Sequence, residues 1–273
     1  MLFFFLLFLT TTSTHSPSVH PQPLPPSPCQ SPRPKSIFLL AGQSNMVGRG
    51  GVDPSIGWDG VVPPECSRNS SILRLTMKLK WVEAQEPLHI DIDTTAINGI
   101  SLGMAFANAV MRQDRSLGLV GLVLCAIGGM KISQWERGMF LYNQFMRQAR
   151  AGMNDGGTIK ALLNRRHVEE SDAVQYKVRL EKFFTDVRTD LQSPELPIFQ
   201  VAIASGQRNF IHEVRKVQLG LDLPNVRTVD ALGLPLKPDQ LHLTTPAEVR
   251  LGQILADAFL QAVLSTKDSS SSV

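Results

Sequence analysis

The chain has 273 residues, of which 43% are hydrophobic and 19% are charged. This composition is typical of a folded globular protein and excludes a disordered or membrane-filling chain. The formal net charge is only +3. Because the basic residues are scattered and form no basic stripe, we expect no nucleic-acid partner.

The N-terminal segment predicts a secreted, extracellular protein. Residues 2–9 form an apolar block, followed by small hydroxyl residues that suit cleavage by signal peptidase. This block is far shorter than the ~20 residues that cross a bilayer as a helix. We therefore expect a signal peptide over residues 1–16 and no stable membrane insertion. Residues 17–35 are rich in proline and predict an extended linker.

Secretion would place the three cysteines in an oxidising compartment, where one disulfide can form. Cys29 and Cys66 lie in segments rich in proline or serine that we expect to be exposed, and they are the pair that we predict. Cys125 ends an apolar run and is expected to be a buried thiol. Asn69 begins an Asn-Ser-Ser sequence, which is a glycosylation signal in a secreted chain.

Apolar runs and helical patterns alternate along the chain. Runs rich in Val, Ile and Leu, each bounded by Gly, Pro or polar residues, predict strands buried on both faces of a parallel sheet. They cover residues 36–42, 117–127, 159–163, 196–204 and 226–231. Helical spacing appears over residues 102–114, 171–192 and 245–264. Residues 72–94 interrupt the alternation with a strand-like pattern and a hairpin or loop, and we treat them as a connection.

Two of the predicted helices begin with capping signals. Ser171 and Asp172 are candidate caps of the second helix, and Thr245 precedes a first-turn proline in the third. The side chains expected to face the core are Met104, Phe106, Ala107 and Val110 in the first helix, Val174, Val178, Leu180, Phe184 and Val187 in the second, and Val249, Ile254, Leu255 and Phe259 in the third.

Strands that alternate with helices predict an α/β protein built from βαβ units, as a three-layer α/β/α sandwich with a central parallel sheet. We expect one such domain over residues 36–264, followed by a disordered tail over residues 265–273. In sheets of this kind the functional groups gather at the carboxyl ends of the strands.

Ser44 stands where the first strand must end, in the segment GQSNM (residues 42–46). Two interpretations are open: an ordinary polar turn, or a nucleophile presented at the edge of the sheet. Asp239 and His242 lie three residues apart, just before the last helix. At that spacing the carboxylate can accept the Nδ1 proton and leave Nε2 free to take a proton from a serine. The same spacing is also common at helix starts, with a capping Asp and a solvated His.

A serine after the first strand and Asp-x-x-His before the last helix occur in the order of the SGNH (GDSL-like) hydrolases. Four segments resemble one branch of them more closely, the sialate O-acetylesterase-like carbohydrate esterases, which include plant members. These segments are GQSNM (42–46), GMAFANAV (103–110), CAIGGMKISQWERG (125–138) and DQLHLTTPAEVRLG (239–252). The resemblance spans about residues 36–264 and implies the SGNH hydrolase, flavodoxin-like fold. The Gly-x-Ser-x-Gly elbow of α/β-hydrolases is absent, because Met46 occupies its last position.

The resemblance implies a triad in which Ser44 is the nucleophile, His242 is the general base and acid, and Asp239 orients the histidine. Gln43 and Asn45 flank the nucleophile, and either hold the loop or contact the substrate. The oxyanion would receive the backbone N–H of the serine, a backbone N–H of a glycine in the second block, and a side-chain amide in the third block.

The second block departs from the branch at the donor glycine. The branch tends to read Gly-x-Gly-Pro-Gly, whereas residues 99–103 read GISLG, so that Ser101 takes the donor position and Gly103 is retained. The N–H of Ser101 can still serve if its backbone torsions suit a residue with a Cβ.

The third block is more strongly altered. The family normally reads Trp-(Tyr/His)-Gln-Gly-Glu-Ser-Asp, but residues 164–169 (NRRHVE) precede Glu170, and the glutamine has no counterpart. Asn164, Arg165 or Arg166 could offer a substitute donor in a shifted register. Otherwise the enzyme is impaired, with a turnover lower by on the order of 10²–10³-fold for one lost donor, or the segment comes from a wrongly spliced gene model. In some relatives the glutamate equivalent to Glu170 supports the histidine in place of the aspartate, or beside it.

From the resemblance we expect a carboxylic ester hydrolase that removes acetyl groups from carbohydrate through an acyl-enzyme, without a cofactor. One alternative is a catalytically impaired carbohydrate-binding pseudoenzyme of the same fold, and another is a lipase-like enzyme that prefers long acyl chains. His167, Glu169 and Glu170 cluster, but no second ligand group has metal spacing, so zinc is not expected. Trp135 is open to two roles, core packing or sugar stacking.

Overall fold

The computed structural model describes residues 34–154, 156–166, 175–204 and 211–270, with side chains as far as residue 265. The predicted signal peptide and nearly all of the predicted linker lie outside the described residues. So do Cys29, Val174, the candidate caps Ser171 and Asp172, and the cluster of His167, Glu169 and Glu170.

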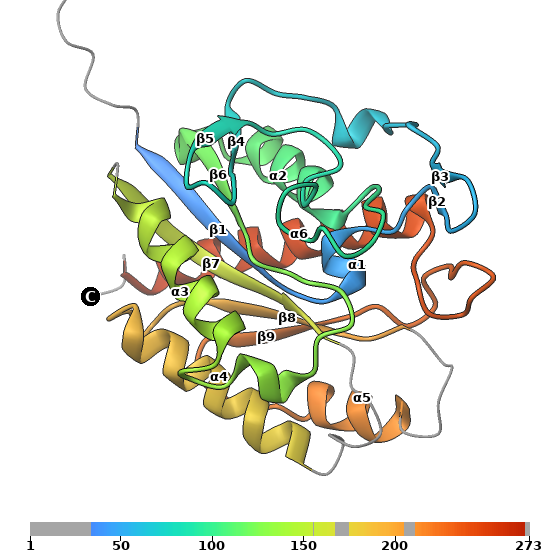
Figure 1. The fold of residues 1–273 in the computed structure, drawn as a ribbon. Coiled ribbons are helices and arrows are strands. Elements are labelled where there is room, and N and C mark those ends of the chain that lie inside the picture. The colour runs from blue at the N-terminus through green and yellow to red at the C-terminus, as the bar shows by residue number, and fades with distance from the viewer. Residues whose placement is uncertain (1–33, 155, 167–174, 205–210, 271–273) are drawn as a thin grey trace, which may run out of the picture. The chain divides into compact units, whose positions relative to one another are not determined.

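The described strands form a central, mostly parallel sheet in the order β5-β4-β6-β1-β7-β8-β9 (Figure 1). Backbone hydrogen bonds from the N–H of Cys125 to Leu40 and from the N–H of Ile127 to Gly42 join β6 to β1. Strand β5 alone runs antiparallel, against β4. The strands are β1 (Lys35–Gly42), β4 (Ile72–Leu75), β5 (Trp81–Glu83), β6 (Leu119–Leu124), β7 (Gly157–Arg165), β8 (Ile198–Ala202) and β9 (Val226–Asp230). A separate hairpin pairs β2 (Val52–Asp53) with β3 (Gly57–Trp58).

Helices cover both faces of the sheet, which confirms the predicted three-layer α/β/α sandwich (Figure 1). Phe38 and Leu40 of β1 belong to the core shared with α2 (Leu102–Gln113) and α6 (Thr245–Ser270). Ile37 and Leu39 belong to the core shared with α3 (Phe140–Met153), α4 (Tyr176–Asp190) and α5 (Ile211–Leu219). Side chains of a strand alternate between faces, so a continuous apolar run serves both layers.

Aromatic side chains join β1 to the helices of the first layer. The ring of Phe38 lies 4.9 Å from that of Phe106 in α2 and 5.0 Å from that of Phe259 in α6, both edge-to-face. Such pairs contribute roughly 0.5–1.5 kcal/mol each beyond the burial of their surface. Short helices complete the structure: α1 (Ser44–Val47), η1 (Pro64–Cys66), η2 (Arg115–Leu117) and η3 (Ile132–Trp135).

Several sequence expectations need correction. Strand β9 pairs only with β8 among the described residues and is largely half-buried or exposed, because it lies at the edge of the sheet. Val178 is 66% exposed, because the buried face of α4 runs through Tyr176, Leu180 and Phe184 instead. Helix α6 continues to Ser270, past residue 264 where the predicted helical pattern ends, and residues 265–270 contain no Gly or Pro that would stop it.

Other predicted elements appear as expected, and some were missed. Residues 72–94 contain the β4–β5 hairpin. The buried face of α2 includes Met104, Phe106, Ala107 and Val110, as predicted. Val249, Leu255 and Phe259 of α6 are buried, whereas Ile254 is half-buried. Helices α3 and α5 were not predicted.

The two cysteines in the described residues are both buried free thiols. For Cys125 this agrees with the prediction. For Cys66 the predicted exposure is wrong: the residue is 1% exposed, because η1 packs against α2. Its predicted partner, Cys29, lies outside the described residues. Burial raises the pKa of both thiols well above its ordinary value.

Candidate active site

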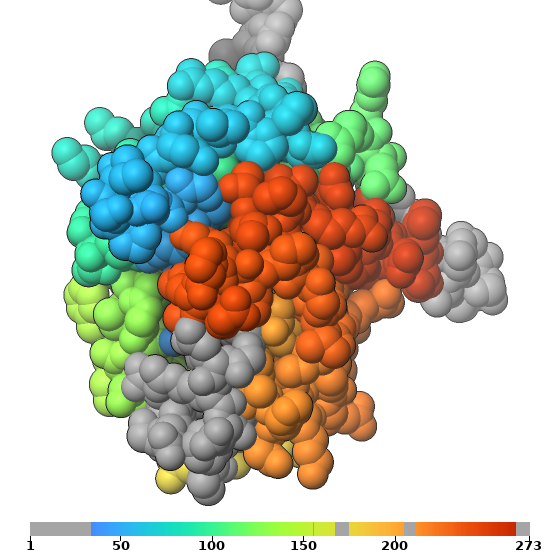
Figure 2. Space-filling model, turned by 90° about the vertical axis from the view of Figure 1, so that its right-hand side faces the viewer, coloured from blue at the N-terminus to red at the C-terminus, as the bar shows by residue number. Residues whose placement is uncertain are grey.

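The candidate site lies at the carboxyl end of β1, where the N-terminal and C-terminal parts of the domain meet. Ser44 is the first residue of α1, separated from the end of β1 by Gln43 alone, and Asp239 and His242 lie in the loop before α6. Figure 2 shows these two parts, in blue and orange-red, in contact on one face of the molecule. Gly42 makes the turn possible: its φ is +153°, and a Cβ there would lie 2.1 Å from the carbonyl oxygen of Arg165 in β7.

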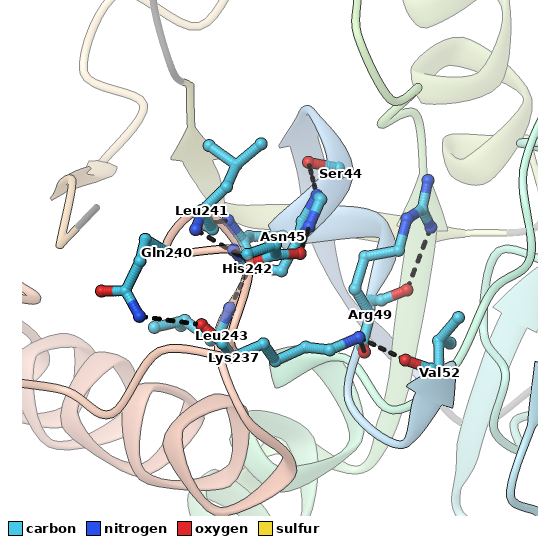
Figure 3. Close-up of polar contacts among 11 residues, drawn as sticks. Ser44, Asn45, Arg49, Val52, Lys237, Gln240, Leu241, His242 and Leu243 are labelled. Atoms are coloured by element: carbon cyan, nitrogen blue, oxygen red, sulfur yellow. Dashed lines mark hydrogen bonds and ion pairs between the residues drawn. The ribbon is translucent and has the colours of Figure 1, made fainter. Parts of the chain in front are cut away.

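The three residues of the predicted triad are in hydrogen-bonding contact. Oγ of Ser44 lies 2.9 Å from Nε2 of His242 (Figure 3), and Nδ1 of His242 lies 2.7 Å from Oδ2 of Asp239. The other carboxylate oxygen accepts the backbone N–H groups of Leu241 and His242, each at 2.9 Å. An Nδ1 proton donated to Asp239 leaves Nε2 as the acceptor for the serine proton.

The electrostatics of the site favour a neutral imidazole. Burial lowers the pKa of His242 below its ordinary value, and the hydrogen bond and charge of Asp239 offset this only in part. Burial by itself would raise the pKa of Asp239, but hydrogen bonds from the backbone and ring of His242 and from the backbone of Leu241 hold it below its ordinary value. The site therefore combines an ionised carboxylate with an imidazole that can accept a proton near neutral pH.

The side chain of Asn45 holds the histidine loop against the nucleophile turn. Its Nδ2 donates to the carbonyl oxygen of Leu241 at 3.1 Å, and its Oδ1 accepts the N–H of Leu243 at 2.8 Å (Figure 3). These two backbone groups lie on either side of His242. Asn45 is only 5% exposed, so it acts in the structure as a clamp between the two segments that carry the triad.

Gln43 is also engaged with protein groups. Its side-chain amide donates to the carbonyl oxygen of Met130, in the loop that follows β6, and its backbone N–H donates to the carbonyl oxygen of Arg165 at 3.2 Å. Gln43 thus ties the turn that presents Ser44 to the two strands beside β1.

In the second block, Ser101 and Gly103 form the start of α2. The N–H of Ser101 donates to Oε1 of Glu86 at 3.3 Å, and its hydroxyl donates to the same oxygen at 3.1 Å. The Ser101 hydroxyl also caps the helix by accepting the N–H of Gly103. A Cβ on Gly103 would lie 2.6 Å from the side chain of Leu88, so close packing explains why this position is a glycine. The amide that the resemblance assigns to the oxyanion is therefore engaged with a buried carboxyl, whose pKa burial raises to about 7.

In the third block, β7 extends through Asn164 and Arg165, and Arg166 follows it. Oδ1 of Asn164 accepts a hydrogen bond from Nε of Arg166 at 3.1 Å. Arg165 is 4% exposed, and two of its guanidinium nitrogens have no hydrogen-bond partner among the described residues. Burial lowers its pKa to about 10, opposed by the charge of Glu248. Glu170 lies outside the described residues.

Arg166 and Trp135 pack together on the side of the sheet covered by α3, α4 and α5. The Arg166 guanidinium lies 4.0 Å from the centre of the Trp135 ring and 4.8 Å from that of Phe183, and burial lowers its pKa to about 9. Trp135 is 1% exposed and contacts Phe145 and Phe183 edge-to-face. Of the two roles left open for Trp135, the structure supports core packing and excludes stacking on a sugar.

Sequence reasoning missed a buried ion pair beside the nucleophile. Arg49 and Asp93 are 3.0 Å apart, with side chains 8% and 0% exposed. The same Asp93 oxygen accepts the N–H of Gly128 at 3.1 Å, and a Cβ on Gly128 would lie 3.7 Å from that of Ser44. Three segments around the nucleophile are thus joined by one carboxylate. An arginine between glycines carries no signal of burial, because its partner lies elsewhere in the chain.

Two cavities open near the nucleophile. One, the polar cavity, has a volume of about 340 Å³ and is lined by four charged or titratable residues (Arg49, Lys237, Asp239 and His242) together with four apolar ones (Val52, Pro54, Ala96 and Ile97). The other, of about 370 Å³, is mainly apolar and is lined by Thr95, Ile127, Met130, Gln134, Met139, Phe140 and Leu141. Thr95 borders the apolar cavity and the next two residues border the polar one, so this loop separates them.

Comparison with known families identifies the protein class. Residues 34–261 match the family described as carbohydrate esterase, sialic acid-specific acetylesterase. The chain belongs to this family of carbohydrate esterases. The family resemblance inferred from the four sequence blocks is thereby confirmed.

Known relatives agree with this assignment. The chain is 50% identical over 242 residues to the "Probable carbohydrate esterase At4g34215" of Arabidopsis thaliana, a match that covers 85% of this chain and 93% of that protein. The solved structure of AT4G34215 has a TM-score of 0.79 at 49% identity, covering 83% of this chain and 98% of that one. NanS has a TM-score of 0.67 at 14% identity, covering 86% of this chain and 99% of that one. At that identity the likeness shows the fold alone.

Two further observations concern the described residues only. Among them, no helix has the length and hydrophobicity needed to span a membrane. They also contain no group of three or more His, Cys, Asp or Glu side chains arranged to hold a metal ion.

Proposed function

We propose that the protein is a serine esterase that removes acetyl groups from carbohydrate, with Ser44, His242 and Asp239 as its catalytic triad. The single observation that carries the proposal is the continuous hydrogen-bonded chain from the Ser44 hydroxyl through both ring nitrogens of His242 to Asp239. Membership of a carbohydrate esterase family supports the reaction class.

In the proposed mechanism, His242 accepts the hydroxyl proton through Nε2 while Oγ of Ser44 attacks the acetyl carbonyl carbon. The carbon–oxygen bond to the sugar then breaks, and His242 returns the proton to the leaving sugar oxygen. A water molecule, deprotonated by the same nitrogen, attacks the acetyl-enzyme and releases acetate. Asp239 holds the imidazole in the required tautomer and stabilises its charged form.

The oxyanion has fewer donors here than the family pattern provides. Ser44 is the first residue of α1, and N–H groups at a helix start have no acceptor within the helix, so its N–H can serve as a donor. The N–H of Ser101 is engaged with Glu86, and the third-block glutamine has no counterpart. Since one donor is worth about 2.7–4 kcal/mol of barrier, we propose an esterase with reduced turnover.

The substrate side of the proposal is an acetylated carbohydrate. Arg49, Lys237 and Asp239 line the cavity beside His242, which suits a ligand rich in hydroxyl groups. The altered third block motivated the alternative of a carbohydrate-binding pseudoenzyme. That alternative receives no support from the family match, and the triad residues themselves are all present and in contact.

The test compares the wild-type protein with Ser44→Ala and with Ser116→Ala, an exposed serine that bonds its neighbour Asp114. Each protein is treated with a fluorophosphonate probe and assayed for acetate release from acetylated xylan and from 4-nitrophenyl acetate. We expect labelling and hydrolysis in the wild type and in Ser116→Ala, and neither in Ser44→Ala. A wild-type protein that is folded but neither labelled nor active on any acetyl ester would refute the proposal.

A further inference from the structure

The apolar cavity adjoins the glycine turn that packs against the nucleophile. Two of its lining residues, Ile127 and Met130, flank the Gly128–Gly129 turn. A Cβ on Gly128 would lie 3.7 Å from the Cβ of Ser44, and the side chain of Gln43 donates to the carbonyl oxygen of Met130. The wall of this cavity is therefore continuous with the turn that presents the hydroxyl.

The triad geometry determines which part of an ester each cavity can hold. The leaving oxygen must receive its proton from Nε2 of His242, so the alcohol has to lie on the imidazole side of Ser44. The polar cavity lies on that side, since His242 and Asp239 line it. The acyl substituent, on the opposite side of the carbonyl carbon, then points towards the Gly128 turn and the apolar cavity.

The lining of the apolar cavity suits a hydrocarbon chain. Met139 and Phe140 are 51% and 75% exposed, although large apolar side chains of this kind are usually buried. The polar groups at the border are engaged: the Thr95 hydroxyl donates to Asp93 at 2.6 Å, and Oε1 of Gln134 accepts the N–H of Lys131 at 2.8 Å. A hydrocarbon chain placed there gains burial and leaves these hydrogen bonds intact.

We propose that this cavity is an acyl-binding subsite, and that the enzyme hydrolyses, besides acetyl esters, esters with longer acyl chains in the range from butanoyl to hexanoyl. The inference rests on the proposed esterase function. In the reaction, Oγ of Ser44 bonds to the acyl carbon, the ester carbon–oxygen bond breaks, and the serine proton passes through His242 to the leaving alcohol. The acyl chain stays in the subsite until water attacks the same carbon and releases the carboxylic acid.

The test uses two series of substrates. In the first, 4-nitrophenyl esters carry acetyl, butanoyl or hexanoyl groups, so that only the acyl side changes. In the second, acetate esters of methanol, butanol and hexanol are followed by acid release, so that only the alcohol side changes. The variants are Met139→Trp, which fills the cavity, and Leu219→Trp, whose site at the end of α5 is 50% exposed and lines neither cavity.

We expect the wild type to hydrolyse the butanoyl and hexanoyl esters in addition to the acetyl ester. Met139→Trp should lower kcat/KM for the hexanoyl ester by about 10-fold or more, because even one methylene in an apolar pocket is worth roughly 10–200-fold in discrimination. The acetyl ester and the whole alcohol series should change less than about twofold. Leu219→Trp should resemble the wild type throughout. Phe140→Ala, at an exposed position, should weaken hexanoyl hydrolysis alone and provides a second route if Met139→Trp does not fold.

The outcomes separate the subsite from the function. Hydrolysis of acetyl esters with none of the longer chains, or equal effects of Met139→Trp and Leu219→Trp, would overturn the acyl subsite and leave the esterase proposal intact. Loss of activity confined to the long-alcohol acetates would also overturn it, because the cavity would then hold the leaving group. No hydrolysis of any ester would refute the proposed function, and the subsite with it.

Discussion

The substitution Asn45→Ala should separate the positioning of His242 from general stability. In the structure the Asn45 side chain bonds the carbonyl oxygen of Leu241 and the N–H of Leu243, the two backbone groups that bracket the histidine. Alanine removes both hydrogen bonds without introducing a new charge or extra volume. The histidine loop would then keep the triad contact with Ser44 and the hydrogen bonds from Lys237 to the backbone carbonyls of Arg49 and Val52.

The expected magnitude follows from the burial of the groups left unpaired. Leu243 is fully buried, and an unsatisfied buried N–H costs about 1–3 kcal/mol. The half-buried carbonyl of Leu241 loses a typical hydrogen bond, worth about 0.5–1.5 kcal/mol. We expect the free energy of unfolding to fall by roughly 2–4 kcal/mol. Because a displacement of about 1 Å can cost 10²-fold in rate, we expect kcat to fall about 10–100-fold with a smaller change in KM.

The assay pairs urea unfolding with steady-state kinetics on an acetyl ester, at a temperature where each variant is fully folded. Asn108→Ala is the matched control, since the Asn108 side chain likewise makes two hydrogen bonds to backbone groups, from Nδ2 to the carbonyls of Glu65 and Ser67, each at 3.0 Å. The control should lose stability and keep its kcat. If Asn45→Ala keeps the wild-type kcat while losing stability, the argument that this side chain positions His242 is wrong.

Three other predictions follow from the site and its surroundings. The kcat/KM of the wild type should fall as pH drops through a pKa below the ordinary ~6.5 of histidine, because burial lowers the pKa of His242. Asp239→Asn should lower the rate by roughly 10⁴-fold and move this acidic limb of the pH–rate profile to still lower pH. A shift of the acidic limb to higher pH would contradict the assignment of His242 and Asp239. Burial raises the pKa of Glu248 from 4.5 to about 8, so the folded state holds the carboxyl proton, and stability present at low pH is lost as pH rises towards 8. In urea unfolding, the free energy of unfolding of Glu248→Gln should therefore rise relative to that of the wild type with increasing pH, by at most about 1.4 kcal/mol per pH unit. A difference in unfolding free energy that does not change with pH would show that the carboxyl is already ionised. Gly42→Ala places a Cβ 2.1 Å from a backbone oxygen of β7 and should lower the free energy of unfolding by more than about 3 kcal/mol. Gly129→Ala, at a position with φ of +72° and no atom within 4 Å of the added Cβ, should lower it by only about 1–2 kcal/mol. Similar stabilities of the two variants in urea would contradict the packing argument.

Local patterns in the sequence were enough to predict the architecture. Apolar runs without alternation indicated strands covered on both faces, and β1 shows why: Ile37 and Leu39 enter one core while Phe38 and Leu40 enter the other. The same rule was wrong for β9, because an edge strand such as Val226–Asp230 can be apolar in part and still lie half-exposed. It also missed α3, whose apolar face includes Leu141 and Phe145.

The site divides in a similar way. Ser44, Asp239 and His242 were predicted from the family resemblance. Chain order and short-range spacing agreed with it, since a carboxylate and an imidazole three residues apart can bond within one turn. Ser101 shows where this kind of reasoning ends: its N–H is engaged by Glu86, 15 residues away. Nothing in the local sequence of either residue indicates that contact.

The sequence by itself determined the layers of the sandwich, the family and the three residues proposed for the triad, because these depend on periodicity and on motifs that are local in the chain. Only the tertiary structure decided how those motifs meet: Ser44 contacts His242 across 198 residues, Asn45 clamps the loop that carries the histidine, and Arg166 stacks on Trp135 instead of facing the nucleophile. The physical reason is that side-chain partners are selected by packing between distant strands and helices. Such contacts leave no mark in the spacing of residues along the chain.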